Sequence, residues 1–291
     1  MLRVREECGG CAAGLEHPFE VPHQSVETDL DAFYSASSQR LSVELVTCPT
    51  CQLVQTGAFL DGERLQAAYA DAEDDEHSKQ FEHRRRSFTR ALEQSVFPSI
   101  PSPSRSPWLD VGTAAGAFVA AARELGVEAS GIEPSGHIVD QAPRDVRPHL
   151  RVGFLERADE SGRVQVISYW DVLEHVPNPR EEVMRVKEHL DVGGFLVLNL
   201  PMIDTVSARL LRRRWPFYLD VHLYYFTRRS LRKFLEPLGF EVLAIHSYSQ
   251  TLDLQYLLSR YLRGRTPPAL LARVPIRYRM GQRTVVAQRV S

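Results

Sequence analysis

The chain has 291 residues, of which 43% are hydrophobic and 25% are charged, and its formal net charge is −2 at pH 7. These values are ordinary for a globular protein and leave room for one full α/β domain with an attachment. The sequence has no apolar run of about eighteen residues and no apolar signal core at its start. We therefore expect no transmembrane helix, and a cytoplasmic protein is the default expectation.

All four cysteines lie near the start of the chain, in the pairs Cys8-Gly-Gly-Cys11 and Cys48-Pro-Thr-Cys51. Two such pairs can place four thiolates around one tetrahedral zinc ion, and a site closed by four cysteines is structural. Two disulfides or a redox pair are the alternatives, although disulfides are rare in the cytosol. We therefore predict a small zinc-ribbon-like subdomain over residues 1–60, with a strand at Leu41–Val46.

The first 75 residues are acidic rather than basic. They also lack the mixture of aromatic and basic residues that is typical of nucleic-acid binding. We therefore expect a small-molecule substrate and no nucleic-acid partner.

Residues 61–106 are expected to form a helical linker, because Lys79–Phe97 has apolar residues on one side at helical spacing. The run His83–Arg86 is expected on the solvated face of that helix. A stretch rich in proline and serine then leads into the main domain, which we place at residues 107–291.

The most informative pattern begins at Leu109–Val111, which is predicted to end a buried strand. The small residues of Gly112–Gly116 follow as a tight turn, and a helix follows the turn. A second short strand, Glu128–Ile132, ends in the acid Glu133. A strand, a small-residue turn, a helix and an acid after the next strand form a site for a nucleoside, whose two ribose hydroxyls donate to the acid.

The turn departs from the dinucleotide-binding fingerprint, because Ala114 and Ala117 stand where glycines are expected. It resembles instead the first motif of class I S-adenosylmethionine-dependent methyltransferases, Asp-x-Gly-x-Gly-x-Gly, which Asp110, Gly112 and Gly116 match. Ala114 departs from this motif too, although its methyl group adds little bulk. The resemblance implies a seven-stranded, mostly parallel, doubly wound α/β sheet of the Rossmann-like class I methyltransferase fold.

The same resemblance implies where S-adenosyl-L-methionine binds. Asp110 and the glycine turn would hold its methionine part, and Glu133 would hold its ribose. The residues implied to contact the cofactor are Asp110, Gly112, Thr113, Gly116, Phe118, Glu133, Pro134 and Trp170.

A second set of motifs extends the resemblance over residues 80–250. The expected elements are the strand Val164–Trp170, the helix Arg180–Leu190, the turn Asp191–Gly194 and the strand Phe195–Leu200. This order, with Asp171-Val-Leu-Glu-His175 after the first strand, is similar to the fourth and fifth strands of ubiquinone-type and sugar-modifying methyltransferases. The segment from His222 to Val242 is similar to the region around their last core helix.

Two insertions are expected to cover the pocket, at residues 202–226 and 251–278. The first contains Arg212–Arg214, which would pair with the phosphates of a nucleotide-linked substrate or face solvent. The second is amphipathic and would shape the pocket, pack in the core, dimerise or touch a membrane surface. The sequence leaves the oligomeric state open.

Methyl transfer requires an aligned acceptor and often a base. His175 follows the fourth strand, where α/β sheets place ligands, and His222 ends the first insertion, so both are candidate bases. In ubiquinone-type O-methyltransferases, a segment similar to Asp171–His175 is implicated in magnesium binding. That resemblance makes Asp171, Glu174 and His175 candidate ligands of Mg²⁺, and helix capping is the alternative role for Asp171.

We therefore predict a cytoplasmic S-adenosylmethionine-dependent methyltransferase that O-methylates a natural product, a sugar or a polysaccharide precursor. C-methylation of a nucleotide-linked keto sugar is the alternative, because the segment at Cys48–Cys51 resembles the zinc segment of some sugar and natural-product methyltransferases. A non-catalytic zinc-ribbon scaffold and a nucleic-acid methyltransferase are rivals from other classes. The latter is disfavoured because no Asn/Asp-Pro-Pro-Tyr/Phe motif follows the fourth strand.

Overall fold

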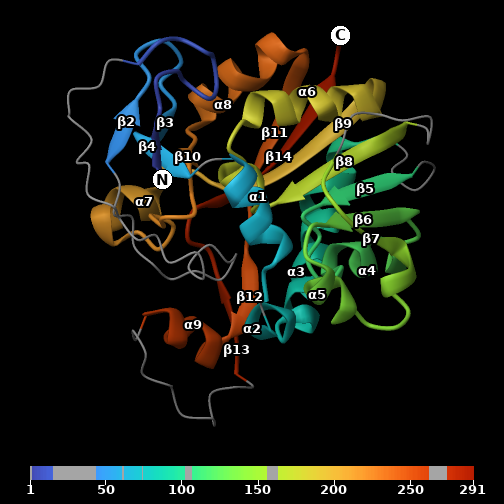
Figure 1. The fold of residues 1–291 in the computed structure, drawn as a ribbon. Coiled ribbons are helices and arrows are strands. Elements are labelled where there is room, and N and C mark those ends of the chain that lie inside the picture. Colours follow the sequence, from blue (N-terminus) through green and yellow to red (C-terminus); the bar gives the residue numbers. More distant parts are fainter. Residues whose placement is uncertain are drawn as a thin grey trace.

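The computed structural model describes residues 2–15, 44–60, 62–73, 75–101, 107–155, 163–261 and 274–291. Its main feature is a seven-stranded sheet with the strand order β11-β14-β9-β8-β5-β6-β7 (Figure 1). The strands are β5 (Trp108–Val111), β6 (Ala129–Glu133), β7 (Leu150–Val152), β8 (Val164–Trp170), β9 (Leu190–Pro201), β11 (Phe240–Ser247) and β14 (Gln282–Arg289). β14 runs antiparallel to both β9 and β11, whereas the pairings among β5, β6, β7, β8 and β9 are parallel. The predicted seven-stranded, mostly parallel sheet is confirmed.

The central strands are buried on both faces because their side chains alternate between two hydrophobic cores. In β8, Ile167 and Tyr169 belong to one core, while Val166 and Trp170 belong to the other. The helices that cover the first face are α6 (Pro179–His189) and α8 (Arg228–Leu235). Those that cover the second face are α3 (Phe81–Ala91) and α4 (Ala117–Glu124). The sheet is therefore the middle layer between helices on both sides.

The strand order places a ligand site at one edge of this sheet. The chain passes from β5 outward to β6 and β7, and then returns to β8 on the other side of β5. Ligands of open α/β sheets bind at the carboxyl ends of the strands where the order reverses in this way. Val111, Glu133 and Trp170 end β5, β6 and β8 at this edge.

β9 differs from the prediction of a turn at Asp191–Gly194. The strand already begins at Leu190 and includes both glycines, and its pairing with β8 shifts register near its start. Gly193 has a φ of +87°, and a Cβ on Gly194 would lie 2.9 Å from the Asp191 carbonyl oxygen. The predicted turn is therefore wrong, because the glycines form an irregularity inside the strand.

Two small sheets surround the cysteine pairs. β1 (Leu2–Val4) pairs with β4 (Ala58–Leu60), and a three-stranded sheet has the order β10-β3-β2. The strands of the second sheet are β2 (Leu45–Thr47), β3 (Val54–Thr56) and β10 (Tyr224–Tyr225). β2 overlaps the end of the strand predicted at Leu41–Val46, of which residues 41–43 lie outside the described part. Because β10 belongs to the insertion at 202–226, that insertion and the cysteine segment share one sheet.

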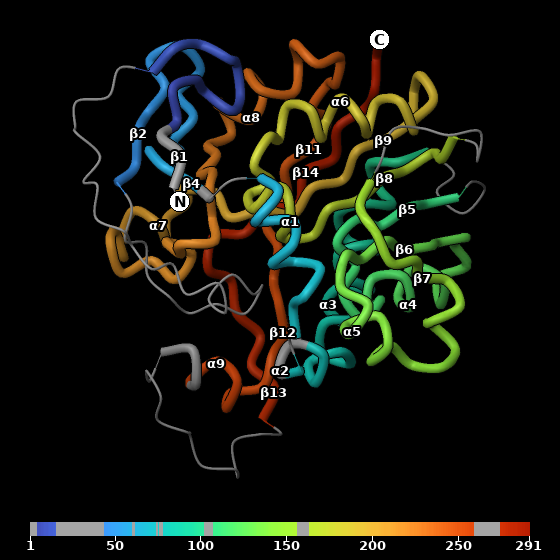
Figure 2. The backbone as a smooth tube through the Cα atoms, viewed as in Figure 1, coloured from blue at the N-terminus to red at the C-terminus, as the bar shows by residue number. Residues whose placement is uncertain are grey.

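The linker and the second insertion are joined along α3. The helix expected at Lys79–Phe97 is present as α3 and continues through a π-helical turn to Val96. In the second insertion, β12 (Gln250–Asp253) pairs with β13 (Pro275–Tyr278). The Gln80 side chain donates to an Asp253 carboxylate oxygen (3.1 Å) and accepts from the Asp253 amide (3.0 Å), so α3 holds β12 beside it (Figure 2).

The remaining helices are short. They are α1 (Gly62–Ala70), α2 (Asp75–Ser78), α5 (Gly136–Asp140), α7 (Val206–Leu211) and α9 (Leu254–Tyr261). Within the described residues, no helix is long and apolar enough to cross a membrane.

Candidate active site

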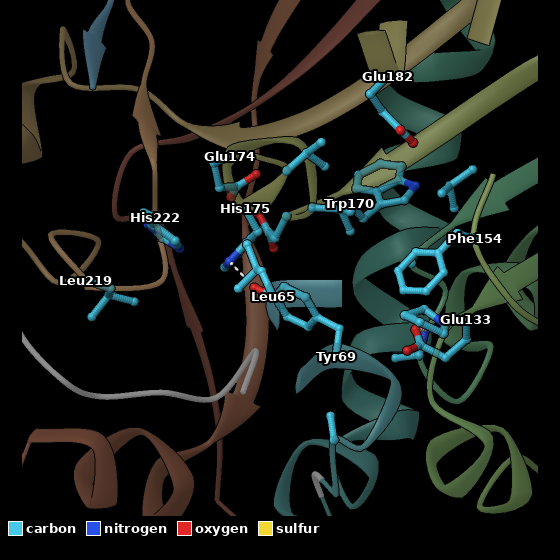
Figure 3. Close-up of a pocket in the computed structure, with 18 of the residues that line it drawn as sticks. Leu65, Tyr69, Glu133, Phe154, Trp170, Glu174, His175, Glu182, Leu219 and His222 are labelled. Atoms are coloured by element: carbon cyan, nitrogen blue, oxygen red, sulfur yellow. Dashed lines mark hydrogen bonds between the residues drawn. The ribbon is translucent and has the colours of Figure 1, made fainter. Parts of the chain in front are cut away.

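A cavity of about 790 Å³ lies at the carboxyl ends of β5, β6 and β8. Its wall combines the glycine turn, the segment after β8, α1 of the linker and residues of both insertions. Figure 3 shows Glu133 at one side of this space and His222 at the other, with Trp170 and His175 between them. One continuous cavity therefore reaches from the predicted nucleoside site to both predicted catalytic histidines.

Glu133 is buried where β6 ends, and two backbone amides hold its carboxylate. The Ala114 amide donates to one oxygen (2.9 Å), and the Ser135 amide donates to the other (3.2 Å). Burial raises the pKa of Glu133 to about 7, and the hydrogen bonds from the two backbone amides oppose this shift. The carboxylate is thereby fixed in orientation at the cavity wall.

The turn between β5 and α4 has the conformation that its small residues permit. Gly112 has a φ of +71°, and a Cβ there would lie 2.5 Å from a methyl group of Val172. Ala114 also adopts a left-handed conformation, with a φ of +51°, although it is not glycine. This conformation directs the Ala114 amide toward Glu133, so the turn and the end of β6 form one unit.

The predicted cofactor residues separate into two groups. Those on the cavity wall are Gly112, Glu133, Pro134 and Trp170. Those that lie behind the wall are Asp110, Thr113, Gly116 and Phe118. Phe118 packs in the core against Trp108 and Trp170, with ring centroids 6.5 and 5.3 Å away. Asp110 is 2% exposed and accepts a hydrogen bond from the Ser168 hydroxyl (2.6 Å), and burial raises the pKa of Asp110 to about 7.

His175 and His222 lie together at the other end of the cavity. Their ring centroids are 4.7 Å apart, with an angle of 85° between the rings. His222 donates from Nδ1 to the Phe217 carbonyl oxygen (2.8 Å), which leaves the lone pair of the neutral ring on Nε2. The Tyr69 hydroxyl hydrogen-bonds to Nδ1 of His175 (3.1 Å), and burial lowers the pKa of His175 to about 4.

Glu174 is the most deeply buried acid of this end, with 1% exposure. Neither of its carboxylate oxygens has a hydrogen-bond partner among the described residues. Burial, and then the charge of Asp171, raise the pKa of Glu174 well above its usual range. One carboxylate oxygen of Asp171 accepts from the side chains of Asn199 and Gln282, both at 2.7 Å.

The cavity wall also contains residues that sequence reasoning missed. Tyr69 comes from α1, where no motif indicated a function. Arg84 was predicted to face solvent, but it lines the cavity and its guanidinium lies over the Phe88 ring, 5.3 Å from the centroid. Residues four apart in a helix lie on the same side, so the spacing of Arg84 and Phe88 could have indicated that Arg84 lies beside the apolar face of the helix.

Arg212–Arg214 form a single 3₁₀ turn and are exposed. They are not part of the cavity wall. Of the two alternatives for this run, the structure therefore shows the solvent-facing one.

The four cysteines come together as the spacing predicted. Sγ of Cys8 lies 3.5 Å from Sγ of Cys51, and Sγ of Cys11 lies 3.6 Å from Sγ of Cys48. These separations exceed the disulfide bond length of about 2.05 Å and approach the roughly 3.8 Å between thiolates around tetrahedral zinc. The hydrogen bond that Cys8 and Cys51 share lowers the pKa of Cys8 and raises that of Cys51, so the two sulfur atoms share a proton that metal binding would release.

The sheet order, the glycine turn and the acid after β6 define a class I methyltransferase fold. A family model described as a methyltransferase domain matches residues 70–245, more than half of the chain. The chain belongs to this family and is an S-adenosylmethionine-dependent methyltransferase. No curated protein matches its sequence.

Solved structures are similar to this chain at low sequence identity. A chain from the complex containing the Haloferax volcanii Trm112 methyltransferase activator is 15% identical, with a TM-score of 0.53, and the match covers 80% of this chain and 100% of that one. An S-adenosylmethionine-dependent methyltransferase from Thermotoga maritima is 16% identical, with a TM-score of 0.47 and coverages of 72% and 91%. The magnesium protoporphyrin IX methyltransferase from Synechocystis is 14% identical, with a TM-score of 0.48 and coverages of 78% and 93%.

Proposed function

We propose that this methyltransferase transfers a methyl group to a hydroxyl oxygen of a small molecule, such as a natural product, a sugar or a polysaccharide precursor. The observation that carries the proposal is the cavity, which joins Glu133 and the glycine turn to a buried polar cluster at His175 and His222. A cofactor at the first end and an acceptor at the second would meet in one enclosed space. In-line methyl transfer requires such an arrangement.

At the cofactor end, Glu133 would accept hydrogen bonds from the two ribose hydroxyls, and Gly112 would let the ligand approach the backbone. Asp110 would support the turn from behind the wall. Arg84 lines the cavity, and its positive charge lowers the pKa of Asp110, although burial of Asp110 is the larger effect. Arg84 would pair with the carboxylate of the cofactor's methionine part.

At the acceptor end, the hydroxyl must lose its proton as the methyl group arrives. The polar groups that meet there are Glu174, His175 and His222. The Tyr69 hydroxyl and the Phe217 carbonyl each hold one imidazole in a fixed orientation. The cluster would therefore activate the acceptor oxygen, while Trp170 and other apolar residues of the wall would exclude water.

The cysteine cluster would hold a structural Zn²⁺. Its four sulfur atoms are packed with Leu53 and Phe234 in the main hydrophobic core, and Cys8, Cys48 and Cys51 are buried. A zinc ion there would fix the two cysteine loops against the methyltransferase fold and would supply no step of the transfer.

The experiment is a transfer assay with methyl-labelled S-adenosylmethionine and a panel of phenols, sugars and nucleotide-linked sugars. We expect a product whose methyl group is bound to oxygen, formed by the His222→Gln variant at least about 100-fold more slowly. The matched control is His149→Gln, since His149 lies off the cavity wall. A methyl group on the carbon beside a carbonyl, as in C-methylation of a keto sugar, would contradict the proposal, and so would methylation of nucleic acid.

A further inference from the structure

We infer that Glu174, His175 and His222 bind a divalent first-row transition-metal ion at the acceptor end of the cavity. Each residue offers one ligand atom, and these atoms lie within 4.8 Å of one another. All three residues line the cavity and are buried, with exposures of 1%, 7% and 5%. The three ligands converge although they come from two segments that are far apart in the sequence.

Glu174 is the strongest single indication of a cation. A carboxylate removed from water is costly unless it is paired, hydrogen-bonded or bound to a metal. Both oxygens of Glu174 are buried, and no described residue donates to either of them. A metal ion between this carboxylate and the imidazoles would supply the missing partner.

The two histidines also have the outer contacts that metal-binding histidines use. Such a histidine usually bonds through its other ring nitrogen to a carbonyl, a carboxylate or a comparable group, which fixes the ring and its tautomer. In His222, Nδ1 donates to the Phe217 carbonyl oxygen, so Nε2 carries the lone pair. In His175, Nδ1 contacts the Tyr69 hydroxyl and the ring also hydrogen-bonds to the Val221 backbone, so a metal ion would replace one of these two contacts.

A backbone hydrogen bond aligns the two segments that carry the ligands. The Leu223 amide donates to the Glu174 carbonyl oxygen at 2.8 Å, immediately beside His222. This bond fixes the insertion to the segment after β8. The ligand geometry is therefore set by the backbone and does not depend on flexible side chains alone.

The donor set indicates the kind of ion. Two imidazoles and one carboxylate suit Zn²⁺, Mn²⁺, Fe²⁺, Co²⁺ or Ni²⁺, whereas Mg²⁺ prefers oxygen ligands and retained water. This set contains His222, which the magnesium motif did not include. Asp171 of that motif lies outside the cluster, where it accepts from Asn199 and Gln282.

Three protein ligands would leave coordination positions open toward the cavity. An acceptor hydroxyl bound there would lose its proton more easily, since a metal ion lowers the pKa of bound water from 15.7 to about 7. The proton would leave to solvent, and the new O–C bond would form while the C–S bond breaks with its electron pair staying on sulfur. This role rests on the proposed function, whereas metal binding itself does not.

The test is a titration of the full-length, metal-free protein with Co²⁺ alone, followed by absorption and by metal analysis after desalting. We expect two sites, one with the thiolate-to-cobalt bands of the cysteine cluster and one without them. Glu174→Gln and His222→Gln should each weaken the second site at least about tenfold and leave the thiolate bands unchanged. Glu181→Gln is the matched control, because Glu181 lines the same cavity outside the cluster.

The wild-type protein decides the question even where a variant does not fold. One cobalt equivalent per chain, all of it thiolate-bound, would overturn the inference. A second equivalent that survives in a folded Glu174→Gln protein would overturn it as well. Because the cobalt titration uses no acceptor, a negative result in it does not bear on O-methylation. A negative result in the transfer assay likewise does not change the number of metal ions bound.

Discussion

His175 and His222 meet edge to face, with ring centroids 4.7 Å apart, although one follows β8 and the other precedes β10. β10 is held in place by its pairing with β3, in which Tyr225 lies opposite Val54. β3 begins shortly after the second cysteine pair, at Cys51. The cysteine segment therefore positions the insertion that brings His222 to the cavity.

This arrangement predicts that Cys51→Ser lowers the thermal stability of the protein as well as its affinity for a metal ion. Without the thiolate, the loops that support β3 would lose the proposed zinc ion, and we expect the melting temperature to fall by about 5 °C or more. Zinc analysis and calorimetric melting measure the two effects. Thr50→Ser is the control, because Thr50 is exposed in the same loop. Loss of the thiolate-bound metal with an unchanged melting temperature would contradict the coupling.

Arg84→Met should weaken the binding of S-adenosylmethionine by roughly tenfold, because it removes a charge from the cofactor end but keeps most of the apolar stem. Arg86→Met is the matched control, since Arg86 is exposed on the same helix and is not part of the wall. Isothermal titration calorimetry measures both affinities. Equal affinities in the two variants would exclude Arg84 from the cofactor site.

The sequence predicted those parts of the site that depend on neighbouring residues. Gly112 and Glu133 could be placed because a strand, a turn, a helix and the next strand follow one another within one short stretch. The apolar run Val164–Trp170 likewise predicted that β8 is buried. It did not show that Ile167 and Tyr169 face one core while Val166 and Trp170 face the other.

Other parts depend on contacts between distant segments, which one sequence does not display. Tyr69 reaches His175 from the linker, and His222 reaches it from the first insertion. The turn predicted at Asp191–Gly194 failed for a related reason. Glycines are typical of turns, but here Gly193 and Gly194 lie between the paired positions Leu190 and Phe195 of β9, where they form a bulge inside the strand.

Ala114→Gly should stabilise the protein by about 0.5–1 kcal/mol, because alanine at a φ of +51° is strained and glycine is not. Ala120→Gly is the opposite control, since it places glycine inside α4 and should destabilise by about 1 kcal/mol. Urea unfolding compares the three proteins. A destabilised Ala114→Gly protein would show that the methyl group of Ala114 contributes packing that outweighs the strain.

Asp110 should make the stability fall as the pH rises. Burial raises its pKa from 3.8 to about 7, so the folded state holds a proton that the unfolded state releases. The resulting stabilisation is complete below pH 3.8 and is lost as the pH rises to about 7. The unfolding free energy of the wild type should therefore fall relative to that of Asp110→Asn, by at most about 1.4 kcal/mol per pH unit.

Urea unfolding at several pH values between 4 and 8 measures this difference. Asp140→Asn, at an exposed acid of α5, is the control for the loss of one carboxylate. Parallel curves for the wild type and Asp110→Asn would show that Asp110 titrates alike in the folded and unfolded states.

The most direct test of the account is a calorimetric titration of the full-length protein with S-adenosylmethionine, beside Glu133→Ala and Glu128→Ala. Glu128 is exposed next to the start of β6, so its variant controls for the loss of one acid. We expect micromolar binding by the wild type and by Glu128→Ala, and affinity at least about 30-fold weaker for Glu133→Ala. Binding that survives unchanged in Glu133→Ala would contradict the placement of the cofactor at the end of β6.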